Sequence, residues 1–192
     1  GAVTFGSRDT GVAGLISEAN SLVGSNPGDQ ISSRGCLALT NGNYLVISPN
    51  WDNDAVQDAG AVTWGNGKTG ITGVVTSANS IVGSAIGDRV GSAGVIRLDL
   101  SNKEQFENNE IGAVDSWATG SVGERAKFDS AMTANGNYVI RSPFWDHGAV
   151  QDAGAVTWAN GDTGITGEVS PANSVVGRSP LDQVGKHWVY TL

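Results

Sequence analysis

Two loops of this chain each combine a tryptophan with several carboxylates, a combination that suits the binding of a sugar. An indole ring can cover the apolar C–H face of a pyranose, and carboxylates accept hydrogen bonds from its hydroxyl groups. The candidate ligand-binding residues are Trp51, Asp52, Asp54, Asp58, Trp145, Asp146, His147 and Asp152. For a sugar site the indoles must be exposed and the carboxylates reachable.

A structural role is the alternative for the same loops. Each tryptophan would then pack between repeated units, and Asp52 or Asp146 would close an Asx-turn. The recurrence of the loop favours this alternative, although sugar-binding repeat proteins also repeat their sites. Three further recurrent aspartates, Asp29, Asp88 and Asp182, are expected to cap turns.

Metal binding and catalysis are weaker alternatives. The three carboxylates of the first loop could hold Ca²⁺ through hard oxygen ligands, but Gly148 replaces Asp54 in the second loop. No nucleophile, base and orienting residue can be identified together, so we expect no enzyme and no cofactor. Cys36 falls in a predicted strand and is expected to be a small buried hydrophobe. A glycosidase-like pair of aspartates remains the third alternative, because the sequence does not show their separation.

The elements that must hold these loops are themselves repeated. Residues 41–64 and 135–158 are identical at 18 of 24 positions, with a constant offset of 94. The motif GAVT followed by an aromatic residue starts at Gly1, Gly60 and Gly154. The sequence therefore predicts a single repeat domain over residues 1–192. Its units are roughly 1–30, 31–86, 87–122 (irregular), 123–183 and 184–192 (partial).

Each full unit is expected to contain four short strands. The segments are rich in Val, Ile, Leu, Thr and aromatic residues and are bounded by Gly, Asn, Asp or Pro. In the second unit they are Arg34–Thr40, Asn43–Ser48, Gly60–Trp64 and Asn79–Ser84. An Asn-Gly turn, which tolerates positive φ, joins the first two strands. Only residues 101–110 suggest a short helix.

The predicted fold class is all-β, with four-stranded antiparallel blades of the β-propeller type. About three to four blades fit in the chain, either alone or as part of a larger ring or array, and a β-solenoid is disfavoured by the long unit. Alternation along a strand puts Ala61 and Thr63 on one face and Val62 and Trp64 on the other, and both faces should be largely buried. The segments Gly1–Phe5 and Lys186–Leu192 are expected to share one blade.

The order of motifs resembles the FG-GAP repeat of integrin-α-like propellers. The corresponding segments here are GDRVG at 87–91, NGNY at 41–44 and 135–138, Ser-Pro at 48–49 and 142–143, GAVTW, and SIVGS at 80–84. The amino-acid sequence of the repeat also looks like repeats of large bacterial exoproteins of the filamentous-haemagglutinin type. This resemblance implies adhesion or ligand binding at a bacterial surface or outside the cell. The calcium loop of that family, DxDxDG, is replaced by TNGN or ANGN, so we expect no metal in these turns.

Charge and composition limit the partners. The net charge of −8 argues against nucleic acid and anionic membranes, and no apolar run is long enough for a membrane span. The expected partner is a cell-surface glycan or protein, together with self-association into a larger assembly. A purely structural spacer or filament subunit is the second interpretation.

Overall fold

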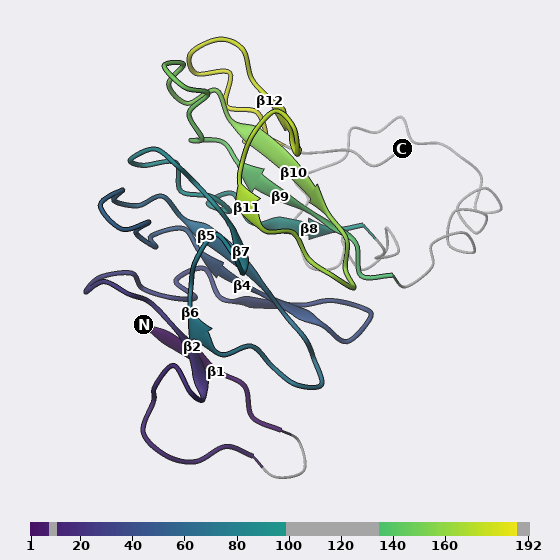
Figure 1. The fold of residues 1–192 in the computed structure, drawn as a ribbon. Coiled ribbons are helices and arrows are strands. Elements are labelled where there is room, and N and C mark those ends of the chain that lie inside the picture. Colours follow the sequence, from purple (N-terminus) through teal and green to yellow (C-terminus); the bar gives the residue numbers. More distant parts are fainter. Residues whose placement is uncertain (8–10, 99–134, 188–192) are drawn as a thin grey trace, which may run out of the picture.

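The computed structural model describes residues 1–7, 11–98 and 135–187, and this part of the chain is all-β (Figure 1). Its three sheets contain three, five and four strands, and none of the sheets closes into a barrel. The described residues include no helix, and therefore none that could cross a membrane. The strands are β1 (Ala2–Thr4), β2 (Ser21–Val23), β3 (Cys36–Ala38), β4 (Tyr44–Ser48), β5 (Ala61–Gly65), β6 (Gly73–Val74), β7 (Ser80–Val82), β8 (Val95–Arg97), β9 (Tyr138–Ser142), β10 (Ala155–Ala159), β11 (Gly167–Glu168) and β12 (Ser174–Val176).

The second and third sheets are each built around four antiparallel strands in the same order, which confirms the predicted all-β repeat of four strands. In the second sheet β3, β4, β5 and β7 pair in that spatial order, and in the third sheet β8, β9, β10 and β12 do so. Val62 of β5 lies opposite Ile47 of β4 on one side and Ile81 of β7 on the other. The first sheet contains only the last two strands of this pattern, β1 and β2, and one additional strand, β6.

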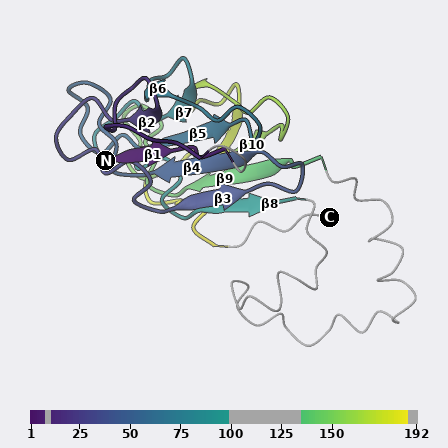
Figure 2. The same ribbon diagram turned by 90° about the horizontal axis from the view of Figure 1, so that it is seen from below.

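The three sheets follow one another in chain order as stacked layers (Figures 1 and 2). Successive residues of a strand point to opposite faces, so each face of the middle sheet packs on a different neighbour. Ala61 packs toward the first sheet with Leu22, whereas Val62 packs toward the third sheet with Ile140. The predicted alternation of Ala61 and Val62 is therefore confirmed, and burial of both faces holds the layers together.

Two short strands cross between layers, and the sequence did not predict them. Along the chain β6 lies between β5 and β7, yet it pairs in parallel with β2 of the preceding sheet. The strand β11 pairs in the same way with β7. The crossing segments, residues 71–75 and 165–169, continue this pairing: Val75 N donates to Val23 O and Val169 N donates to Val82 O, each at 3.0 Å. Counted as one unit each, the three sheets with their loops are the first, second and third units in chain order, and the second and third units are each hydrogen-bonded to the one before.

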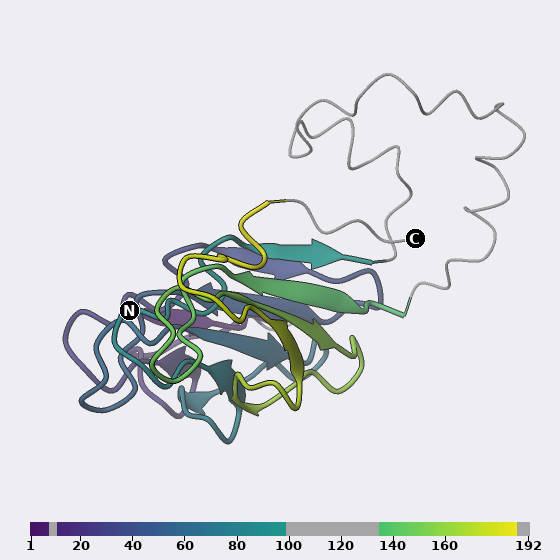
Figure 3. The ribbon, with the colours of Figure 1, turned by 90° about the horizontal axis from the view of Figure 1, so that it is seen from above.

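The predicted irregular unit contributes a strand to the third sheet. The strand β8 pairs with β9, although residues 98–137 separate them in the chain. The predicted short helix at 101–110 lies outside the described residues, as do residues 188–192. The proposed sharing of a blade by the two ends therefore stays a prediction. The middle sheet lies between the first and the last (Figure 1), and in the view from above the strands of the three sheets overlap (Figure 3).

The prediction for Cys36 is half right. It lies in a strand, but its side chain is exposed rather than buried. The reason is the position of β3 at the edge of the second sheet, where Leu37 points to the core and Cys36 points away from it.

Candidate functional site

The two loop tryptophans occupy equivalent positions, and both are buried. Trp51 is 2% exposed and packs at the junction between the first and second units; Trp145 is 3% exposed and packs between the second and third. The backbone oxygen of each accepts a hydrogen bond from the glycine nine residues on, Gly60 or Gly154, at 2.9 Å. His147 stacks on Trp145, with ring centroids 5.6 Å apart. Neither indole therefore presents the open face that stacking on a sugar requires.

The first carboxylate of each loop holds the loop closed. Asp52 Oδ1 accepts from Asp58 N at 2.8 Å, and Asp146 Oδ1 accepts from Asp152 N at 2.7 Å. These bonds span six residues, so the loop is wider than the expected Asx-turn. Asp54 stands at the exposed tip of the first loop, with φ +54°.

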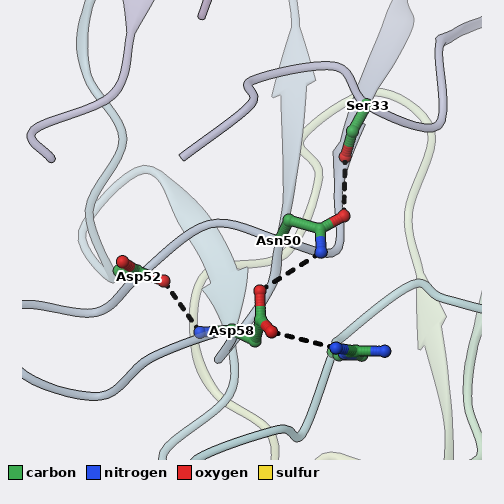
Figure 4. A network of polar contacts seen from close by, with 5 residues as sticks. Ser33, Asn50, Asp52 and Asp58 are labelled. Atoms are coloured by element: carbon green, nitrogen blue, oxygen red, sulfur yellow. Dashed lines mark hydrogen bonds and ion pairs between the residues drawn. The ribbon is translucent and has the colours of Figure 1, made fainter. Parts of the chain in front are cut away.

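The remaining carboxylate of the first loop belongs to a polar network (Figure 4). Asp58 accepts from Asn50 Nδ2 at 3.2 Å, and Asn50 in turn accepts from Ser33 Oγ at 3.3 Å. Arg89 forms an ion pair with Asp58 at 2.9 Å, and the two side chains are 47% and 28% exposed. Solvent screening makes such a pair a weak contributor to stability. Within the described ranges no three His, Cys, Asp or Glu side chains converge as metal ligands.

Aspartates that the sequence predicted only as turn caps also form polar contacts across the junctions. The turn-cap prediction is confirmed: Asp29 Oδ2 accepts from Asn26 N, and Asp88 Oδ2 accepts from Ser84 N. Their second oxygen has a role that was missed, because it reaches into the next unit. Asp29 Oδ1 accepts from Asp52 N at 3.2 Å, and Asp88 Oδ1 accepts from the equivalent nitrogen of Asp146 at 2.9 Å.

A recurrent serine makes the second polar contact of each junction. Ser32 N donates to Ser48 Oγ at 2.9 Å, and Gly91 N donates to Ser142 Oγ at 3.1 Å. Both acceptors are the serine of the Ser-Pro motif, three positions before the loop tryptophan. The constant spacing of this motif is the signal that could have identified them.

An aromatic residue over a glycine completes each junction. A Cβ on Gly70 would collide with Phe5, and one on Gly164 would collide with Trp64. Only glycine therefore allows the aromatic ring to approach the next unit so closely. Trp64 also donates from Nε1 to Gly161 O at 2.8 Å.

We expect Asp88→Ala to destabilise the protein by about 2–4 kcal/mol, because it leaves three partly buried backbone N–H groups without their acceptor. Asp88 is fully buried and accepts from Ser84, Ala85 and Asp146. Asp182→Ala is the matched control, since Asp182 accepts only two bonds at an exposed turn. Urea unfolding measures both variants, and equal losses would contradict the junction role of Asp88.

Opposite pH dependences are expected at Asp88 and Asp182. Burial raises the pKa of Asp88, with a further contribution from Asp146, although backbone hydrogen bonds oppose this. Hydrogen bonds from Ser179 N and Arg178 N lower the pKa of Asp182. A raised native pKa favours folding at low pH, and this contribution is lost as the pH rises through that pKa. A lowered native pKa has the reverse effect, so its contribution is lost as the pH falls.

The test compares the wild type with Asp88→Asn and Asp182→Asn between about pH 2 and pH 6. With rising pH, the wild type should lose unfolding free energy relative to Asp88→Asn and gain it relative to Asp182→Asn. The same sign for both pairs would refute the assignment of the two environments.

Comparison with known protein families identifies the family of this chain. A family model described as a repeat of unknown function (DUF5650) matches residues 1–33, 38–92 and 132–186. Each matched segment supplies the central strands of one sheet: β1 and β2 in the first, β4, β5 and β7 in the second, and β9, β10 and β12 in the third. Neither a search of curated proteins nor a search of solved structures finds a match. The repeated sequence, the repeated junctions and the family model agree, and the chain belongs to the family of DUF5650 repeats.

Proposed function

We propose that this chain is a non-enzymatic structural repeat, a spacer or filament-forming segment whose units stack face to face. The observation that carries the proposal is that the same junction is made twice by equivalent atoms. Asp29 joins Asp52 in the first junction, and Asp88 joins Asp146 in the second. The two tryptophans that suit a sugar by type, Trp51 and Trp145, are buried in these junctions, and Asp52 and Asp146 hold their loops closed.

Stacked units of this kind form a quasi-one-dimensional array. Each unit buries apolar residues only against its neighbours, so stability grows with the number of junctions. A constant rotation between units gives either a closed ring, as in a propeller of FG-GAP type, or an open filament. Both forms are compatible with a role as a rigid element of a bacterial surface or secreted protein, which rests on the resemblance of the motifs.

Adhesion is the second candidate function, and the loop tips favour it. Asp54 and Ala55 are exposed at the tip of the first loop, and Gly148 and Ala149 are exposed in the second. Equivalent tips displayed along an array could bind a surface glycan or protein through several weak contacts at once.

A binding screen separates the two functions. The full chain, applied to a glycan array, should give no signal above that of an unrelated acidic protein of similar size. Binding that disappears in Asp54→Ala, with unchanged unfolding free energy, would overturn the structural proposal in favour of adhesion. Asp54→Ala is suitable because its side chain makes none of the junction contacts described above.

A further inference from the structure

The third unit exposes residues whose equivalents are covered in the second unit. Val175 is 70% exposed, whereas its equivalent, Ile81, is fully buried under the third unit. Trp158 is 51% exposed, whereas Trp64 packs on the third unit and donates to Gly161 O. The outer edge of β12 has no neighbouring strand among the described residues, although β2 and β7 each pair with a crossing segment. These are the same apolar and backbone groups that form the two existing junctions.

Asp182 is the equivalent of Asp88, the aspartate that makes the polar contact of the second junction. Its Oδ2 accepts from Arg178 N at 2.9 Å and Ser179 N at 2.8 Å, as Asp88 Oδ2 does within its own turn. In the described part of the chain its Oδ1 has no hydrogen-bond partner, whereas Asp88 Oδ1 accepts from the next unit. The turn thus holds Asp182 in place independently of any neighbour.

The first unit exposes the other side of such a junction, namely a crossing segment that has no preceding unit to lie on among the described residues. Leu15 is 92% exposed and Ile16 is 68% exposed, whereas Val75, the equivalent of Ile16, is 1% exposed because its crossing segment lies on the preceding unit. The two ends of the described stack therefore expose different surfaces. One end carries an unpaired crossing segment, and the other carries the surface that such a segment covers.

We propose that the outer face of the third unit, formed by Trp158, Val175, the edge of β12 and Asp182, is a docking surface for a further complete repeat unit of this family. This inference rests on the proposed structural function and names the contacts by which the array continues. The crossing segment of the incoming unit pairs in parallel with β12, and one of its glycines lies under Trp158. The backbone N–H of its Trp-Asp loop donates to Asp182 Oδ1, and its Ser-Pro hydroxyl accepts from Gly185 N.

A complete unit fits this face better than the first unit of a second copy of the chain. In a second copy the segment from Gly11 to Ile16 could pair with β12. The first sheet, however, contains only the counterparts of β5 and β7 and the crossing strand β6, with no described Trp-Asp loop. It therefore offers neither the N–H for Asp182 nor the serine hydroxyl for Gly185. Continuity with the two existing junctions assigns the face to a unit that has both.

The test lengthens the protein by one unit. Residues 33–91 are duplicated between Gly185 and Lys186, so that the copy follows the third unit as the second follows the first. We expect amide hydrogen exchange in β12 and in residues 178–185 to slow by about tenfold or more relative to the parent chain. In NMR titration the pKa of Asp182 should rise on docking, as burial raises that of Asp88.

Asp182→Asn supplies the matched control, because an amide can keep the turn cap but loses one carboxylate acceptor. In the lengthened protein it should remove most of the added protection, and in the parent chain it should change exchange only within its own turn and leave exchange in β12 unchanged. No added protection in a lengthened protein that retains its two original junctions would overturn the docking proposal. The structural function would then still stand, since its own test is the absence of specific ligand binding.

A second variant keeps the test decisive if the lengthened protein does not fold. Placing a copy of residues 33–59 before Gly1 completes the first unit, including its Trp-Asp loop. Sedimentation velocity should then show head-to-tail association that increases with concentration and is abolished by Trp158→Lys with Asp182→Asn. Failure to associate would overturn the proposal. Equal association of the parent chain, unaffected by Asp182→Asn, would assign the face to a second copy and overturn it as well.

Discussion

Trp145→Ala should lower the free energy of unfolding by about 3–5 kcal/mol, the usual range for deleting a buried tryptophan. The side chain is 3% exposed and belongs to the cluster that joins the second and third units, beside Ile140 and Ala155. Its removal leaves a cavity in the junction that neighbouring strands can fill only by shifting. Denaturant unfolding monitored by circular dichroism measures the loss.

Two further substitutions locate the origin of this effect. Trp158→Ala should change the unfolding free energy by about 1 kcal/mol or less, because this indole is 51% exposed in the same unit. Trp145→Phe should retain much of the stability, since Trp145 Nε1 has no hydrogen-bond partner within the described residues. A large loss at Trp158 and a small one at Trp145 would contradict the assignment of Trp145 to the junction.

Gly60→Ala is expected to destabilise the protein by about 3 kcal/mol or more, through two separate effects. Gly60 has φ +75°, a conformation that alanine adopts only with strain. A Cβ at this position would also overlap the backbone nitrogen of Val90, which donates to Ala59 O at 3.1 Å. Because the obstacle is backbone rather than a flexible side chain, the strand and the turn segment must separate.

Gly148→Ala measures the cost of the positive φ alone, without the steric collision that a Cβ meets at Gly60. Gly148 has φ +62°, but no atom lies within 4 Å of the position a Cβ would occupy. The expected loss is therefore only about 1 kcal/mol. Gly154→Ala should behave like Gly60→Ala, since Gly154 meets the backbone of Val184 in the same way. Similar losses for Gly60→Ala and Gly148→Ala would show that the close approach contributes little.

Local patterns in the sequence determined the strands and the turns. Alternation in the GAVTW motif correctly assigned Ala61 and Val62 to opposite faces, because a strand has a strict period of two. The Asn-Gly pair predicted a turn with positive φ, and Gly42 has φ +88°. The recurrent Asp29 and Asp88 cap turns as expected, since a short carboxylate reaches backbone N–H groups a few residues away. These features depend on neighbours in the chain.

The tertiary structure decided which side chains face a neighbouring unit. Trp51 and Trp145 suit a sugar site by residue type, but the stacking of units buries both indoles. Cys36 lies in the expected strand and is exposed because that strand is an edge, which depends on the order of strands in the sheet. The two-residue strands β6 and β11 have too little sequence for a pattern of their own. They form because the preceding unit presents an unpaired strand edge at that position.

The sequence by itself therefore determined the repeat, the all-β class and the turns, because these follow from periodicity and from the local preferences of glycine, asparagine and aspartate. The tertiary structure alone showed that the second oxygen of Asp88 binds the nitrogen of Asp146, 58 residues further along the chain. Residue type and spacing give no distance across such a separation. That contact exists because burial of apolar faces brings consecutive units together, and the carboxylate and the loop nitrogen meet only at the resulting junction.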